Sequence, residues 1–268
     1  MAGNALDMPR VTIRQALDGH MLINLLATAA LAGPLQLQTQ DGVALSAHEE
    51  GAGENGVVLV HGKGGSHADW RALSTRLSAN GFHVVAVDLR GHGGSAGAPL
   101  GAEDYLSMTG DVEAAARWLH DNGAKEVSVI GAELGANVAL NAASDSKSIA
   151  NVLLLSPGLN HEGVKVGAAI GSWSGPLLLV SGTGDVMGAK AANILADKAS
   201  GPKHLELPET PARGVGLLNS VPELEGLLIS WLNGSFRSAS DPASVRPEIS
   251  DHGSEDIETT GTRLEDRR

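Results

Sequence analysis

The sequence predicts an α/β fold in which a mostly parallel sheet carries helices on both faces. Short runs such as Val57–Val60 and Val84–Val87 are apolar throughout, as in strands buried on both faces. Segments with helical spacing of apolar residues follow these runs, and such alternation is typical of parallel sheets. The chain has 268 residues, of which 42% are hydrophobic, so one domain over residues 35–234 can bury a large core.

A β-hairpin is expected at the start of this domain. Apolar and polar residues alternate from Leu35 to Thr39 and again from Val43 to Ala47. Asp41-Gly42 lies between the two runs, and this dipeptide is a frequent hairpin turn.

The remaining elements follow from the apolar runs and the spacing between them. The expected strands cover residues 57–60, 84–87, 127–130, 152–155, 176–180 and 204–207. The expected helices include Trp70, Leu73 and Leu77 and then cover residues 105–120, 134–144, 188–199 and 215–232. Residues 157–175, between two strands, are too few for a lid domain.

Residues 1–34 are predicted to be a leader. Met21–Ala32 is apolar, Arg10 and Arg14 precede it, and small residues end it, as in a secretory signal cleaved after Ala32. That interpretation favours a periplasmic or secreted protein. The alternative is a short buried helix in a cytoplasmic protein. The run is too short to span a membrane.

Residues 235–268 are predicted to form a disordered acidic tail. The segment has no Trp or Tyr and few large apolar residues, so it cannot bury enough surface to offset the entropy of ordering.

Charge and cysteine content exclude several classes of function. The net charge of −12 argues against a nucleic-acid partner, because phosphate binding needs clustered cations. The chain has no cysteine, which excludes disulfides, zinc-thiolate sites and cysteine nucleophiles.

Polar, glycine-rich segments follow four of the expected strands. They are HGKGG at 61–65, DLRGHGGS at 88–95, GAELG at 131–135 and SGTGD at 181–185. Ligands of open α/β sheets bind beyond the carboxyl ends of the strands, so these four segments are the candidate site.

In order and spacing, these segments resemble the α/β-hydrolase family over residues 35–233, specifically its lidless serine esterases, lipases and dienelactone-hydrolase-like members. The resemblance implies an α/β-hydrolase fold with no lid domain. It makes HGKGG the oxyanion-hole turn, GAELG the nucleophile elbow and Asp185 the acid of the triad.

Two positions depart from the family's pattern. Glu133 occupies the position of the nucleophilic serine, and Arg213, in Ala212-Arg213-Gly214, occupies that of the histidine. Arginine does not lose its proton in proteins and cannot act as the base. Relatives with a carboxylate nucleophile still need the histidine to activate water.

The two substitutions compensate each other electrostatically. A guanidinium can bridge carboxylates through paired hydrogen bonds. We therefore expect Glu133, Arg213 and Asp185, the three positions equivalent to the triad, to form an inactive ion cluster.

Backbone groups can keep a binding role despite these changes. The N–H groups of Lys63 and Leu134 are the expected oxyanion donors, with His61 and Gly62 supporting the turn. They would receive a small ligand with a carbonyl or carboxylate group. His161 is the histidine best placed to face the cleft.

No cofactor or metal is expected. Glu133, Asp185 and His161 have no recognised metal-ligand spacing, and the glycines do not form a dinucleotide fingerprint.

Three hypotheses of function remain open. The first is a binding or scaffold protein that is related to serine esterases but has lost their catalysis. The second is a working hydrolase of small esters that uses Glu133 as nucleophile or base. The third is a structural protein whose cleft is filled.

Overall fold

The computed structural model describes residues 32–97 and 101–234 of the chain. Its central sheet has eight strands, and a separate two-stranded sheet stands beside it. The strands of the central sheet are β1 (Ala32–Gln38), β2 (Ala44–Glu50), β3 (Asn55–Val60), β4 (Phe82–Val87), β5 (Glu126–Ala132), β6 (Asn151–Leu155), β9 (Leu177–Val180) and β10 (Lys203–Glu206). The helices are η1 (His67–Trp70), α1 (Arg71–Ala79), α2 (Ala102–Ser107), α3 (Thr109–Asp121), α4 (Leu134–Asp145), α5 (Gly167–Ser172), α6 (Val186–Lys198), α7 (Gly216–Ser220) and α8 (Leu224–Leu232).

The sheet is parallel except at the edge formed by the hairpin. Its strand order is β1-β2-β4-β3-β5-β6-β9-β10. The pair β1–β2 is antiparallel, as the Asp41-Gly42 turn predicts, and β2 pairs antiparallel with β4. The strands from β4 to β10 run in the same direction, so their carboxyl ends share one edge.

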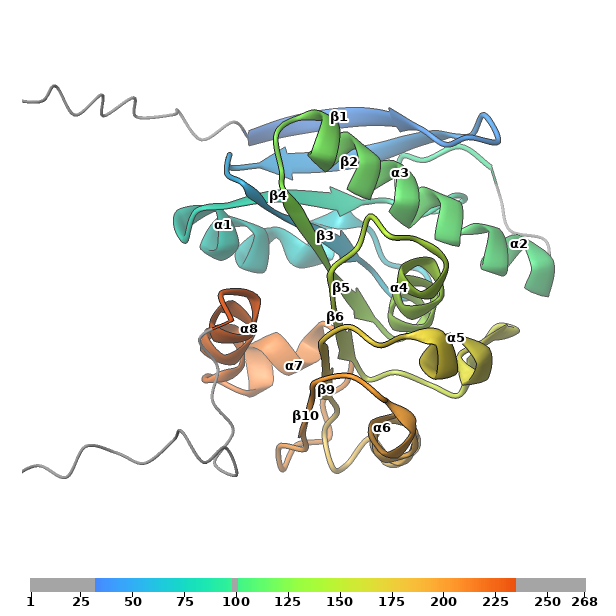
Figure 1. Ribbon diagram of the computed structural model, residues 1–268, viewed down its shortest axis with the longest axis vertical. Coiled ribbons are helices and arrows are strands. Elements are labelled where there is room, and N and C mark those ends of the chain that lie inside the picture. Colours follow the sequence, from blue (N-terminus) through green and yellow to red (C-terminus); the bar gives the residue numbers. More distant parts are fainter. Residues whose placement is uncertain (1–31, 98–100, 235–268) are drawn as a thin grey trace, which may run out of the picture.

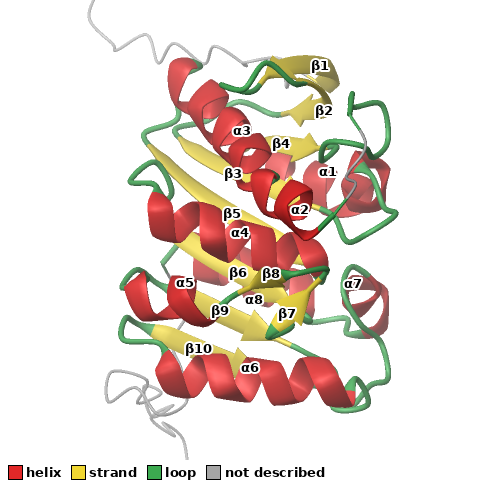
Figure 2. Ribbon diagram, turned by 90° about the vertical axis from the view of Figure 1, so that its right-hand side faces the viewer, coloured by secondary structure: helices red, strands yellow, loops and turns green. Residues whose placement is uncertain are grey.

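Helices cover both faces of this sheet, as the apolar strands require (Figures 1 and 2). On one face α3, α4, α5 and α6 enclose a core that includes Val129, Leu140 and Leu179. On the other face α1, α7 and α8 enclose a core that includes Trp70, Ile130 and Leu228. Each buried aliphatic side chain contributes about 1.5–3 kcal/mol of transfer free energy, so the two cores fix the sheet between its helical layers.

Two expected helices are each divided in the structure. The segment predicted as one helix over 105–120 forms α2 and α3, which meet at the fully buried Met108. Thr109 and Gly110, which follow the junction, are poor helix formers. The helix predicted over 215–232 is divided into α7 and α8 because Pro222 cannot continue a helix and restricts Val221.

The segment after β6 holds more structure than expected. It contains the hairpin of β7 (Asn160–His161) and β8 (Val164–Lys165), followed by α5. Glu162 and Gly163 both have positive φ, as the two-residue turn of a tight hairpin requires. The segment is still too short to form a lid domain.

The predictions for the two ends of the chain fall mostly outside the described residues. The leader, with its apolar run, and the acidic tail lie in residues 1–31 and 235–268, apart from the last residues assigned to the leader. Those residues belong to β1, which begins at Ala32 and pairs there with Glu50. No helix in the described ranges is long and apolar enough to cross a membrane.

Arg90 joins the turn after β4 to two other parts of the chain. Its guanidinium donates to Asp111 of α3 through Nε and Nη2 at 2.9 and 2.7 Å, and through Nη1 to Asp41 of the hairpin turn at 2.7 Å. Asp111 is fully buried and also accepts from the Arg90 backbone N–H. The hydrogen bonds and the positive charge of the Arg90 side chain therefore offset most of the free-energy cost of burying the Asp111 carboxylate.

Removing that side chain should destabilise the fold strongly. We expect Arg90→Met to lower the free energy of unfolding by about 3–5 kcal/mol, because it leaves the Asp111 charge buried without a counterion. Urea denaturation measures the loss. Lys125→Met is the matched control, since the Lys125–Glu54 pair is exposed on both sides and should contribute less than ~1 kcal/mol. Equal losses in the two variants would contradict this account.

Candidate functional site

The candidate site lies where the carboxyl ends of the parallel strands meet. His61 follows β3, Glu133 follows β5, and Ser156 follows β6. Asp185 follows β9 after a short turn, and Arg213 lies between β10 and α7. Residues as far apart in the chain as His61 and Arg213 are thus brought to one edge of the sheet.

Glu133 occupies a strained turn between β5 and α4. Its backbone has φ 51° and ψ −113°, a region that residues other than glycine rarely adopt. The flanking glycines make this turn possible. A Cβ at Gly131 would collide with the backbone of Gly135, and one at Gly135 would collide with the carbonyl oxygens of Val60 and His61. The sharp elbow geometry is therefore present although the residue at its tip is glutamate.

Glu133 and Arg213 form a direct ion pair. Arg213 Nε lies 2.6 Å from Glu133 Oε1, and the two side chains are 58% and 31% exposed. Gly214, with φ +54°, brings the chain against the Glu133 side chain. A Cβ added to Gly214 would lie about 3.0 Å from Glu133 Cγ. The Gly214 N–H in turn donates to the buried Ser156 hydroxyl at 2.9 Å, which fixes the loop that carries Arg213.

Asp185 stands apart from this ion pair. Its Oδ1 accepts a hydrogen bond from the Gly188 N–H at 3.2 Å, so the carboxylate caps the first turn of α6. The expected three-member cluster is thus corrected to one ion pair with a neighbouring helix-capping carboxylate. The cap offers Asp185 an alternative partner, because a carboxylate is favourable at a helix N-terminus.

His61 braces the turn after β3. Its Nε2 accepts from the Leu89 N–H at 3.1 Å, which leaves Nδ1 to donate to the Gly62 carbonyl at 2.7 Å. The ring is fully buried, and burial lowers the pKa of His61. The neutral imidazole therefore holds two turns together and is not exposed to a ligand.

The two expected oxyanion donors have no protein acceptor in the described part of the chain. Neither the Lys63 N–H nor the Leu134 N–H takes part in a turn, loop or capping hydrogen bond there. Gly62 packs against Glu133, where a Cβ would lie 2.8 Å from Glu133 Oε2. The Glu133 carboxylate therefore lies close to the backbone of the turn after β3.

The side chain of Lys63 forms a contact that the sequence did not predict. Its Nζ lies 2.9 Å from Glu162 Oε1, at the tip of the β7–β8 hairpin, and 5.8 Å from the centre of the Tyr105 ring. The turn after β3 is thereby joined to the segment after β6. The one local signal for this contact is the hairpin turn at Glu162-Gly163, where both residues have positive φ.

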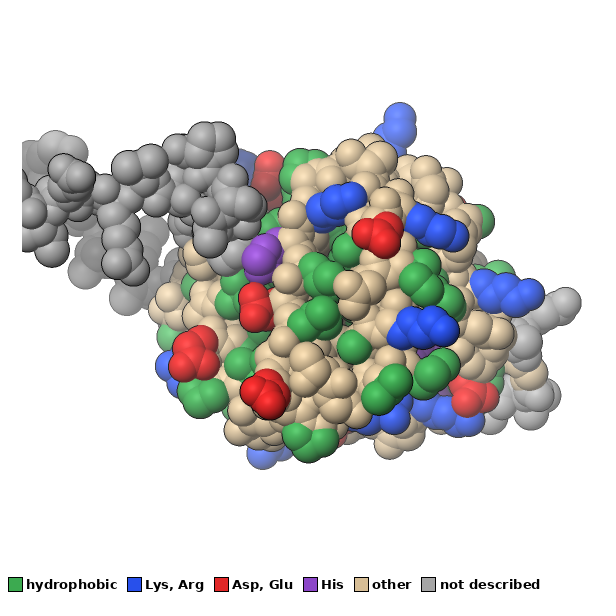
Figure 3. Space-filling model, turned by 90° about the horizontal axis from the view of Figure 1, so that it is seen from below, with side chains coloured by type: hydrophobic (Ala, Val, Ile, Leu, Met, Phe, Trp, Pro, Cys, Tyr) green, Lys and Arg blue, Asp and Glu red, His purple; other side chains and the backbone are tan. Residues whose placement is uncertain are grey.

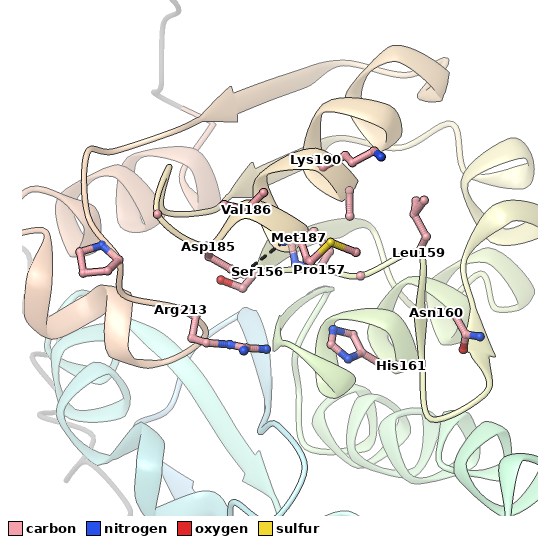
Figure 4. A pocket seen from close by; sticks show the side chains of 15 residues that line it. Ser156, Pro157, Leu159, Asn160, His161, Asp185, Val186, Met187, Lys190 and Arg213 are labelled. Atoms are coloured by element: carbon pink, nitrogen blue, oxygen red, sulfur yellow. Dashed lines mark hydrogen bonds between the residues drawn. The ribbon is translucent and has the colours of Figure 1, made fainter.

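His161 faces the cleft, as its position after β6 suggests. It lines a pocket together with Asp185 and Arg213 (Figure 4). Burial lowers the pKa of His161, and the Arg213 charge lowers it further, while Glu133 acts in the opposite direction. Among the described residues, no group of histidine and carboxylate side chains is arranged to hold a metal ion.

Known proteins share this fold. Residues 53–181 match the family described as "Serine aminopeptidase, S33". The structure resembles an esterase of Pyrococcus furiosus (TM-score 0.66, 22% identity, 76% of this chain and 93% of that one). It also resembles an esterase of Exiguobacterium antarcticum (0.65, 16%, 75% and 100%) and a dienelactone hydrolase of Anabaena variabilis (0.63, 16%, 78% and 99%).

The chain therefore has the α/β-hydrolase fold, and its residues 53–181 match a family model of serine aminopeptidases. A curated relative is 32% identical over 127 residues, the dihydrolipoyllysine-residue acetyltransferase component of the acetoin cleaving system of Cupriavidus necator. The match covers 47% of this chain and only 33% of that protein.

The strain at Glu133 can be measured as stability. We expect Glu133→Gly to be more stable than Glu133→Ala by about 1 kcal/mol, because glycine adopts a positive φ without the cost paid by other residues. Both variants lose the ion pair with Arg213. The difference between their free energies of unfolding, measured by urea denaturation, therefore reports the strain of the backbone at residue 133. An alanine variant as stable as the glycine variant would show that the elbow is unstrained.

The environment of His161 makes a second prediction. Its imidazole should titrate below the ordinary value of 6.5 in the folded protein, because partial burial disfavours the charged form of the ring. A depressed pKa contributes stability that is present above the unfolded value and lost as pH falls through the folded value. NMR titration gives the pKa, and His161→Gln should weaken the loss of stability below pH ~6.5. A midpoint at or above the unfolded-chain value would contradict the assignment.

Proposed function

We propose that this protein binds a small ligand at the former active site of a serine esterase or lipase and does not hydrolyse it. The observation that carries the proposal is the 2.6 Å ion pair between Arg213 and Glu133, at the positions of base and nucleophile. A carboxylate held by a guanidinium is a weak nucleophile. The guanidinium itself cannot take up a proton at any ordinary pH.

Binding remains available where catalysis is lost. The Lys63 and Leu134 N–H groups are backbone donors, so changes of side chain leave them in place. They suit a ligand with a carbonyl or carboxylate group. The pocket beside Arg213 favours a ligand-binding protein over a purely structural one with a filled cleft.

The alternative function is hydrolysis of small esters by an unusual route through Glu133. His161 gives this alternative its one supporting observation, because it is a neutral imidazole on the same cleft. A nucleophilic Glu133 would attack the ester carbonyl, release the alcohol and form a mixed anhydride with the acyl group, and a base must then activate water to hydrolyse that anhydride. His161 is the described residue that would have to serve.

A pair of reverting substitutions tests the proposal. The parent should not hydrolyse short-chain p-nitrophenyl esters, whereas Glu133→Ser combined with Arg213→His should hydrolyse them. Each single revertant should be much less active than the double one, because triad members act as a unit.

Two controls make the outcome specific. In the double revertant, Asp185→Asn should lower kcat by orders of magnitude, on the order of 10⁴, if Asp185 orients the restored histidine. Activity in the parent that disappears in Glu133→Ala and in His161→Gln would overturn the proposal in favour of the alternative.

A further inference from the structure

The pocket beside the ion pair has a volume of about 730 Å³, well within the range of small-molecule sites. One wall is the segment after β6, from Ser156 to His161, and the opposite wall is the N-terminal part of α6 with its capping residue, from Asp185 to Ala191. Pro211 and Arg213 line it from the loop before α7. Figure 4 shows the Arg213 guanidinium directed towards His161 across the pocket.

The walls of this pocket carry an unusual share of the exposed apolar surface. Four large hydrophobic side chains are exposed in the described part of the chain, and three of them line this pocket. They are Leu159 at 45% exposure, Val186 at 70% and Met187 at 75%. Figure 3 shows hydrophobic side chains at the surface of the end of the molecule that carries β10 and α6, with Lys and Arg side chains among them. Apolar groups gathered at a pocket indicate a ligand with an apolar part.

The end of the pocket at Arg213 is suited to an anion. Arg213 uses Nε for Glu133, and neither of its Nη groups forms a hydrogen bond with the described residues. Those two NH₂ groups can hold a carboxylate through paired hydrogen bonds. Lys190, which also lines the pocket, is a second cation and has no ion pair there. The neutral His161 adds no charge of its own.

The one carboxylate that lines the pocket is already engaged. Asp185 caps α6 through Gly188, where the helix terminus offsets its negative charge. An ammonium head group would have to compete with that cap and would also face Arg213. An anionic head group meets neither obstacle.

We propose that the pocket binds an aliphatic monocarboxylate, with its carboxylate on Arg213 and its chain against Leu159, Val186 and Met187. This inference rests on the proposed function, since it assigns a ligand class to the same non-hydrolytic site. The chain-binding part depends only on the apolar walls, and the head-group part depends on the Arg213 side chain.

Calorimetric titration of the full-length protein with hexanoate, octanoate and decanoate, each kept monomeric, tests the chain-binding part. Affinity should rise about threefold to fourfold with every methylene that enters the pocket. Met187→Asp should abolish that rise. Leu106→Asp is the matched control, because Leu106 is the remaining exposed large hydrophobic residue and lies outside this pocket, so its chain-length dependence should equal that of the parent.

The head-group part is tested by Glu133→Gln combined with Arg213→Gln, which removes both charges and leaves the net charge unchanged. Affinity for decanoate should fall about tenfold or more, because a hydrogen bond to a charged group is lost. Equal binding of decanoate and decyltrimethylammonium by the parent would overturn the carboxylate assignment. Affinity independent of chain length would overturn the inference itself.

Failure of the proposed function gives a different result. Ester hydrolysis by the parent would refute a non-hydrolytic protein and would leave decanoate binding unaffected, as the binding of a product. If the parent does not hydrolyse esters and its affinity for the carboxylates does not depend on chain length, only the inference of an aliphatic ligand is refuted.

Discussion

The close approach of β5, α4 and the turn after β3 is the constraint on which the rest of the site depends. Gly131 and Gly135 have no room for a Cβ, because backbone atoms of the elbow and of Val60 and His61 occupy it. This packing holds Glu133 at positive φ whatever its side chain does. The fold therefore sets the position of the side chain at residue 133, at the tip of the turn between β5 and α4. The identity of the residue sets what that side chain can do chemically.

That separation explains how the site accommodates the charged side chains of Glu133 and Arg213. Glu133 is about one-third exposed and Arg213 more than half, so neither charge carries the desolvation cost of a deeply buried ion. Arg90 and Asp111 illustrate the opposite case, because a carboxylate with no exposure depends on its guanidinium. The Glu133–Arg213 pair should therefore contribute little to global stability.

The fold could be predicted from the sequence because its signals are local. Apolar runs such as Val57–Val60 indicate buried strands, and the Asp41-Gly42 turn fixes the hairpin register. The predicted helices were wrong where tertiary packing or a single helix-breaking residue decides whether a helix continues. Met108 divides one helix at a buried junction, and Pro222 divides another.

The candidate site was predicted less completely than the fold. The turns that follow the strands indicated Glu133, Arg213 and Asp185. No sequence pattern, however, predicts with which of the two carboxylates the Arg213 guanidinium forms an ion pair. Asp185 has a competing partner in the first turn of α6, which depends on where that helix begins. The hydrogen bond between Ser156 and Gly214 joins residues 58 positions apart and has no local signature.

The strength of the contact between Lys63 and Glu162 should depend on the salt concentration of the surroundings. This contact fastens the turn after β3 to the tip of a small hairpin through two side chains that are 54% and 41% exposed. Exposed charges of this kind attract each other less as ionic strength rises. The contact between the turn after β3 and the β7–β8 hairpin should therefore weaken as the salt concentration rises, whereas the two buried cores are not affected.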